Sequence, residues 1–146
     1  MKILEESDIT LAGIGLEDGL CDGVSGAFVT FVGTPRVFSQ GKHVRALHYE
    51  AYKPMAEEIM NRIIADARRR WPLEQVIVKH RLGVVAIGEI SIFIQVAASH
   101  RREAFAACEF LVDSIKKEVP IWKKELYTEG GGHWVHCDRE KAHDLV

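Results

Sequence analysis

The chain has 146 residues, a length that suits one compact domain, and its 47% hydrophobic and 27% charged residues are typical of a globular protein. A net charge of −2 argues against general affinity for nucleic acid, and no apolar run approaches the ~20 residues that cross a membrane. Because the N-terminus lacks the parts of a signal peptide and the three cysteines form no Cys-x-x-Cys pair, we expect a cytoplasmic protein without disulfides.

The first third of the chain predicts a loop and two strands. Residues 12–26 hold five glycines, but no Gly-Lys-Ser/Thr follows them, so they predict an irregular loop rather than a nucleotide-binding one. β-Branched and aromatic residues over 27–32, and alternation over 44–52, predict strands. We expect these two strands to pair as a hairpin with a long loop.

Two amphipathic helices are predicted. The first begins at Pro54, since proline suits a first helical turn, and ends before Pro72. The second runs from about His100 to Glu118, with Ser99 as its N-cap. The expected apolar positions are Met55, Ile59, Ile63, Ala67 and Trp71 in the first helix, and Phe105, Cys108, Val112, Ile115 and Val119 in the second.

The remaining segments predict strands. The pattern over 75–82 places Val76, Val78 and His80 on one face, and the almost wholly apolar run over 90–98 is typical of a central strand buried on both faces. The order of all elements, β-β-α-β-β-α-β-β, predicts an α+β sandwich with helices on one face of a mostly antiparallel sheet. The last two strands are expected over 121–127 and 133–136.

Basic residues stand where the buried strand passes into the second helix, in Ser99-His100-Arg101-Arg102. A helix N-terminus has free N–H groups and a partial positive charge, so it binds anions. Positive side chains there oppose the helix dipole by roughly 0.3–1 kcal/mol, which favours a role in binding a phosphate. From the spacing alone, an equal alternative is that both arginines point into solvent.

A lysine-rich segment surrounds Pro120, which ends the second helix. Lys116 falls in the last helical turn, where the dipole favours a cation. Lys123 follows in the next strand, where alternation places Glu125 on the same face. A helix–proline–strand corner can bring the two amines together, and a lysine that titrates near neutral pH can act as acid, base or nucleophile. Taken alone, the segment favours ordinary surface lysines.

Two further candidate sites have weaker sequence signals. Arg36 follows Pro35 in the loop after the first strand, where a guanidinium could fork onto phosphate or carboxylate, although an exposed loop arginine is the commoner case. His133, His136 and Cys137 have poor spacing for zinc, because residues three apart in a strand point to opposite faces and no second pair completes four ligands. We therefore expect no metal and no cofactor.

Five segments in this order resemble the large, catalytic subunit of molybdopterin synthase. No single segment is decisive, but the set is highly specific and extends from about Gly26 to about Val135. The segments are GAFVTFVG at 26–33 with Arg36 after it, HYEAYKPMAEE at 48–58, RRWPL at 69–73, ASHRREAF at 98–105, and IKKEVPIWKKE at 115–125.

The resemblance implies a fold and an assembly. The fold would be an α/β hammerhead with a small additional antiparallel sheet, formed by one domain over residues 1–146, of which 1–25 give no usable match. Two such subunits would form a homodimer at the centre of a heterotetramer. A small ubiquitin-like sulfur carrier would bind at each end and insert its C-terminal Gly-Gly tail, which bears a thiocarboxylate. Its sulfur would pass to cyclic pyranopterin monophosphate, giving the dithiolene of molybdopterin.

The resemblance also implies roles for individual residues. Lys116 and Lys123 match the family's two essential lysines. The other matches are expected to bind substrate: His100 and Arg101 as an anion-binding pair, Arg36 from the loop, Glu125 after the second lysine, and Arg139 as the basic residue near the C-terminus that reaches across the dimer.

Two other functions compete with this hypothesis. One is a non-catalytic module of the same fold that binds a ubiquitin-like partner, against which the intact set of Lys116, Lys123, Arg36 and His100 argues. The other is a small anion-binding or nucleotide-binding protein unrelated to sulfur, which would lack a groove for an extended Gly-Gly tail.

Overall fold

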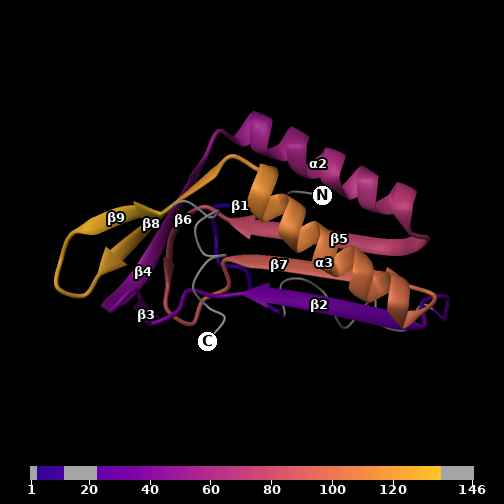
Figure 1. The fold of residues 1–146 in the computed structure, drawn as a ribbon, viewed down its shortest axis with the longest axis horizontal. Helices are drawn as coiled ribbons and strands as arrows, with labels where there is room; N and C mark the ends of the chain where they lie inside the picture. The colour runs from indigo at the N-terminus through magenta and orange to yellow at the C-terminus, as the bar shows by residue number, and fades with distance from the viewer. Residues whose placement is uncertain (1–2, 12–22, 136–146) are drawn as a thin grey trace.

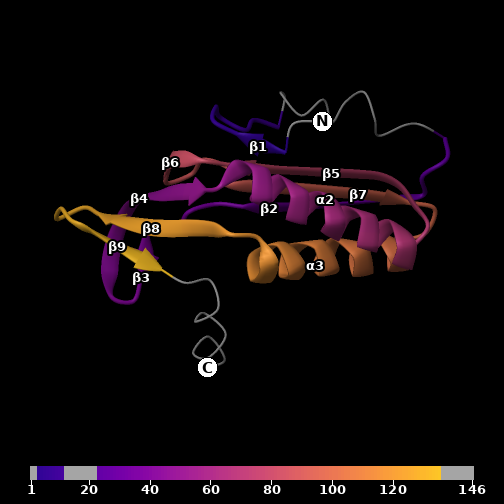
Figure 2. The same ribbon diagram turned by 90° about the horizontal axis from the view of Figure 1, so that it is seen from above.

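Two antiparallel helices cover one face of a four-stranded sheet in the computed structural model, which describes residues 3–11 and 23–135 (Figure 1, Figure 2). The sheet has the strand order β1-β5-β7-β2, and all its neighbours are antiparallel except β1 and β5. The α+β class and the placement of the helices are therefore confirmed. The elements are β1 (Leu4–Glu5), β2 (Ala27–Gly33), β5 (Leu73–Arg81), β7 (Ile92–Ala98), α2 (Lys53–Arg70) and α3 (Arg101–Glu118).

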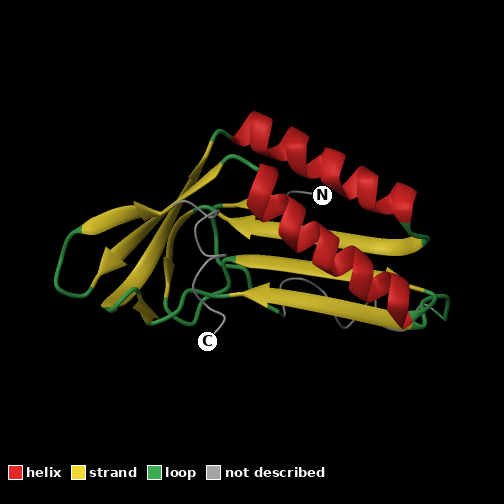
Figure 3. Cartoon of the chain, viewed as in Figure 1, coloured by secondary structure: helices red, strands yellow, loops and turns green. Residues whose placement is uncertain are grey.

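A second antiparallel sheet lies beyond one end of the first, where α2 begins and α3 ends (Figure 1, Figure 3). Its strand order is β3-β4-β8-β9, and β6 pairs with β4. The short strands β1, β3 and β6 were not predicted, because two to four residues carry too little periodicity. The strands of this sheet are β3 (Phe38–Ser39), β4 (Lys42–Ala51), β6 (Gly83–Ala86), β8 (Ile121–Tyr127) and β9 (Gly132–Val135).

The expected hairpin between residues 27–32 and 44–52 is wrong. β2 instead pairs along its whole length with β7, from Ala27 opposite Ala98 to Gly33 opposite Ile92, while β4 belongs to the second sheet. This pairing places the apolar side chains of Val29 and Phe31 against the core beneath α3. Burial of that apolar face outweighs the proximity of β2 and β4 in the sequence.

The core lies between the helices and the first sheet. Every residue of β7 is buried, and Val76, Val78 and His80 of β5 alternate as predicted. The predicted helix faces are partly wrong: α2 buries Ala56 and Met60, whereas Met55 is 49% exposed, and in α3 Phe105 is 63% exposed.

The start of α3 also differs from the expectation. His100, not Ser99, is its N-cap residue, and no side chain caps it. Within the described ranges, neither helix is long and apolar enough to span a membrane.

Candidate active site

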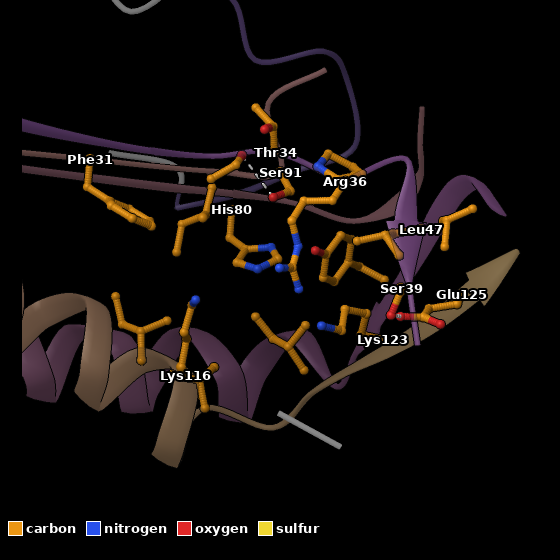
Figure 4. Close-up of a pocket in the computed structure, with 18 residues that line it drawn as sticks. Phe31, Thr34, Arg36, Ser39, Leu47, His80, Ser91, Lys116, Lys123 and Glu125 are labelled. Atoms are coloured by element: carbon orange, nitrogen blue, oxygen red, sulfur yellow. Dashed lines mark hydrogen bonds between the residues drawn. The ribbon is translucent and has the colours of Figure 1, made fainter. Parts of the chain in front are cut away.

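A pocket of about 410 Å³ opens where the two sheets meet the end of α3 (Figure 4). Three of its walls carry a positive side chain: Arg36 comes from the loop after β2, Lys116 from α3 and Lys123 from β8. The structure thus brings together three residues that lie up to 87 positions apart in the sequence. The remaining walls combine apolar, aromatic and hydroxyl-bearing side chains, with His80, Glu125 and Tyr49 as the other titratable groups.

The register of β8 against β4 directs Lys123 into this pocket. Lys123 stands opposite Tyr49, and Glu125 stands opposite Leu47. Side chains of paired residues leave a sheet on the same face, so all four line the pocket. The residue between Lys123 and Glu125 points the other way: the Nζ of Lys124 lies 5.6 Å from the ring centroid of Trp134. The predicted alternation in this strand is confirmed.

The corner between α3 and β8 places Lys116 on the neighbouring wall. The helix ends at Val119, whose N–H donates to Ile115 O at 3.1 Å, and Pro120 prevents its continuation. The chain then turns directly into β8, so this short corner positions both Lys116 and Lys123 at the pocket. The Nζ of Lys116 lies 5.9 Å from the ring centroid of Phe31, within the range of a cation–π contact.

The loop that carries Arg36 is fixed at its base. Ser91 donates twice to the carbonyl oxygen of Gly33, from its backbone N–H at 2.9 Å and from its hydroxyl at 3.0 Å. Pro35 is buried, which anchors the next part of the loop, while Arg36 itself is largely exposed. The guanidinium therefore extends from a rigid base into the pocket (Figure 4).

Glu125 is a buried carboxylate with two hydroxyl donors. Ser39 Oγ donates to its Oε1 at 2.7 Å, and Tyr127 OH donates to its Oε2 at 3.0 Å. Burial, and then the hydrogen bond and negative charge of Glu125, raise the pKa of Tyr127. Both oxygens of Glu125 are thus engaged within the protein, at the point where the Arg36 loop meets β8.

His80 also lines the pocket, and sequence reasoning did not select it as a functional residue. It was recognised only as a member of the buried face of β5. The sequence does contain a signal for a functional role: His80 is a titratable residue on a strand face whose other members are valines. Its ring packs edge to face against that of Tyr49, with 5.0 Å between the centroids.

Two of the predicted site residues lie away from this pocket in the same chain. His100 and Arg101 are exposed at the first turn of α3, while Lys116 stands in its last turn. Arg101 and Lys116 are 15 positions apart, which corresponds to a rise of roughly 22 Å along an α-helix. Figure 1 shows α3 beginning at the end of the first sheet that lies away from the second sheet and β8.

Three further candidates lie outside the described residues: Arg139, His136 and Cys137. Of the cysteines, Cys108 is described; it is buried in the core, and burial raises the pKa of its thiol. Among residues 3–11 and 23–135, no group of three or more His, Cys, Asp and Glu side chains could hold a metal ion.

The arrangement suits a small anionic ligand. Two amines and a guanidinium on three separate walls can contact different parts of one molecule, and a half-enclosed pocket strengthens each charge interaction relative to bulk water. Amines can in addition donate protons or stabilise a developing negative charge. The fold and pocket together define an α+β protein with a cation-lined ligand site.

Comparison with known proteins identifies the family. The chain belongs to the MoaE protein family, whose model matches residues 5–118. It is 41% identical over 138 residues to a molybdopterin synthase catalytic subunit of Nostoc sp., covering 92% of this chain and 84% of the relative. It is 47% identical over 104 residues to the molybdopterin synthase catalytic subunit of Homo sapiens, covering 71% of this chain but 55% of that relative.

A solved structure shows the same architecture. The crystal structure of molybdopterin synthase from Staphylococcus aureus matches with a TM-score of 0.83 and 33% sequence identity, covering 92% of this chain and 98% of that one.

Proposed function

We propose that this chain is the catalytic subunit of a molybdopterin synthase and transfers sulfur from the C-terminal thiocarboxylate of a small ubiquitin-like carrier to cyclic pyranopterin monophosphate. The observation that carries the proposal is the convergence of Lys116, Lys123 and Arg36 on one pocket. The relatives' name, catalytic subunit, supports a second subunit in the working enzyme. We expect the reaction to take place in the cytoplasm.

The geometry suggests a division of roles. Arg36, on its anchored loop, is suited to hold the substrate phosphate in a forked pair of hydrogen bonds. Lys123 would favour the thiocarboxylate anion and hold its sulfur near the pterin side chain. Lys116, on the neighbouring wall, would assist proton transfer as the cyclic ester opens and water leaves.

His100 and Arg101 fit this scheme only through a second copy of the chain. Since α3 separates them from their own pocket, we propose that a homodimer presents them, with Arg139, to the pocket of the partner. They would then add hydrogen-bond donors at the phosphate end of the substrate.

The test combines the purified chain, a thiocarboxylated carrier and cyclic pyranopterin monophosphate, and measures molybdopterin. Lys123→Ala should lower the rate by roughly 100-fold or more, the usual contribution of a positioned acid–base or charge-stabilising group. Lys124→Ala is the matched control, because that lysine is its neighbour on the outer face of β8, and it should leave the rate close to wild type. Circular dichroism should show both variants folded.

Two outcomes would count against the proposal. Wild-type turnover by Lys123→Ala would remove Lys123 from the mechanism. No product from the wild-type chain with a fully charged carrier would favour the alternative of a non-catalytic module that binds the carrier.

A further inference from the structure

His80 is the one histidine of the described residues that is buried. It lies near the end of β5, and its side chain lines the pocket. The residue is 7% exposed to solvent. Figure 4 shows its ring among the side chains that line the pocket, on the same side as Arg36. Tyr49, which stands opposite Lys123, packs against the ring and restricts its rotation. The ring is therefore a fixed part of the pocket wall.

One hydrogen bond determines which ring nitrogen carries the proton. His80 Nδ1 lies 2.8 Å from the carbonyl oxygen of Arg81. A carbonyl oxygen can only accept, so Nδ1 must be the donor. In a neutral imidazole the other nitrogen, Nε2, then has a lone pair and no hydrogen.

The lone pair of Nε2 is available to a ligand. Among the described residues, no group forms a hydrogen bond with Nε2. The fully enclosed polar atoms without a partner are Arg81 Nε and Glu103 Oε2, so Nε2 is not fully enclosed. It therefore has some access to solvent, which for this residue is the pocket. Burial lowers the pKa of His80 to about 4, so the ring is neutral at neutral pH.

The pocket's charged nitrogens offer the opposite chemistry. Arg36, Lys116 and Lys123 present N–H donors, which suit phosphate and thiocarboxylate oxygens. A pterin also has N–H donors on its ring system, and these need acceptors once water is excluded. The carboxylate of Glu125 is already engaged by Ser39 and Tyr127.

We propose that His80 Nε2 accepts a hydrogen bond from an N–H group of the bound pterin and so orients its ring system, a role that rests on the proposed function. His80 would then be a substrate-binding residue that contributes to specificity: it recognises the heterocycle, while the cations hold the phosphate. The contact persists from the bound substrate to the transition state, so its loss should raise KM and leave kcat largely unchanged.

Two substitutions separate this contact from a structural role. His80→Phe preserves a ring against Tyr49 but removes the acceptor, whereas His80→Gln places an amide oxygen close to the position of Nε2. Loss of one buried hydrogen bond should raise the dissociation constant for cyclic pyranopterin monophosphate roughly two- to twelvefold in His80→Phe. The Gln variant should recover most of that affinity. Both variants should bind the carrier as wild type does.

A measurement on the wild-type chain tests the contact directly. With ¹⁵N-labelled histidine, the Nε2 signal of His80, assigned from its absence in His80→Gln, should move upfield when the pterin is added. An unchanged signal at saturating pterin would overturn the proposal, as would equal pterin affinity in His80→Phe and wild type, or equal losses in the Phe and Gln variants.

The same measurement separates this idea from the proposed function. If the pterin shifts the His80 signal but no molybdopterin forms with a charged carrier, the proposed sulfur transfer fails and the recognition of the pterin by His80 stands.

Discussion

Glu125 illustrates how one residue can organise the site without a demonstrated contact to substrate. A buried carboxylate keeps its charge only where donors replace the water it has lost. Here the donors are Ser39, in β3 just after the Arg36 loop, and Tyr127, two residues further along β8. The Ser39–Glu125 hydrogen bond thus ties the segment that carries Arg36 to the strand that carries Lys123.

Ser39→Ala tests that tie. We expect it to lower the free energy of unfolding by about 1–3 kcal/mol, because one oxygen of a buried carboxylate loses its donor. It should also weaken pterin binding, since Arg36 would no longer be held relative to Lys123. Urea unfolding and a pterin titration measure the two effects. Thr128→Ala is the control: it removes an exposed hydroxyl that bonds to His43 O at 3.3 Å, outside the pocket. If Ser39→Ala and Thr128→Ala have equal effects, the Ser39–Glu125 hydrogen bond does not hold Arg36 relative to Lys123.

Only some of these residues were identifiable from the sequence. Alternation in β8 correctly placed Lys123 and Glu125 on one face, because a strand has a strict period of two. The spacing alone favoured surface lysines, and the resemblance to a family selected them as functional. Ser39 and His80 were missed, because their importance comes from neighbours that are distant in the sequence: 86 positions separate Ser39 from Glu125.

At the level of elements, the end of β2 connects the fold to the site. Gly33 is the last residue of β2, pairs with Ile92 of β7, and is followed by the loop that carries Arg36. A Cβ at Gly33 would lie 2.5 Å from Cγ2 of Ile92, a distance that the side chain of a buried β-branched residue cannot easily relieve. The absence of a side chain at Gly33 therefore leaves room for the side chain of Ile92 at the end of β2.

Gly33→Ala should accordingly destabilise the protein by about 1–3 kcal/mol, the usual cost of overpacking a well-packed region. The clash should also displace the Arg36 loop and weaken pterin binding. The matched test is the same substitution in an Ile92→Ala background, where the clashing Cγ2 is absent. Urea unfolding of the four proteins gives a double-mutant cycle. The cost of Gly33→Ala should largely disappear in the second background; an equal cost in both would show that the contact with Ile92 is not its cause.

The elements themselves were predicted better than their partners. Both helices and the buried strand β7 were recognised because proline boundaries and apolar patterns are local signals. The pairing of β2 was wrong, since alternation reveals which face is buried but not which strand lies alongside. The helix face of α2 was misplaced because a strict four-residue spacing drifts around a helix of 3.6 residues per turn, so that Met55 was chosen in place of Ala56.

At the level of the whole molecule, the site depends on the junction between two sheets. His80 belongs to the first sheet and Tyr49 to the second, and their rings meet across this junction. A charged imidazole at that position would be desolvated between the sheets. Protonation of His80 should therefore lower the free energy of unfolding of the whole molecule, and not only weaken a local contact.

This predicts a loss of stability on mild acidification. Burial lowers the pKa of His80 from 6.5 to about 4, so between these values the unfolded chain binds a proton that the folded chain does not. Stability then rises with pH through this window, and it falls as the pH drops from 6.5 toward 4, by roughly 3 kcal/mol in all and about 2 kcal/mol between pH 7 and pH 5.

Urea unfolding of wild type and His80→Phe at pH 7 and pH 5 measures this loss of stability. Glu89 also contributes to the pH dependence of stability, because the hydrogen bond from the Ala86 N–H is the main cause that lowers its carboxyl pKa from 4.5. Its stabilising contribution is lost mainly at pH values below 5, and it is the same in both proteins. His80→Phe should lose about 2 kcal/mol less than wild type between pH 7 and pH 5; parallel pH profiles would mean that the buried ring does not govern the acid sensitivity of the fold.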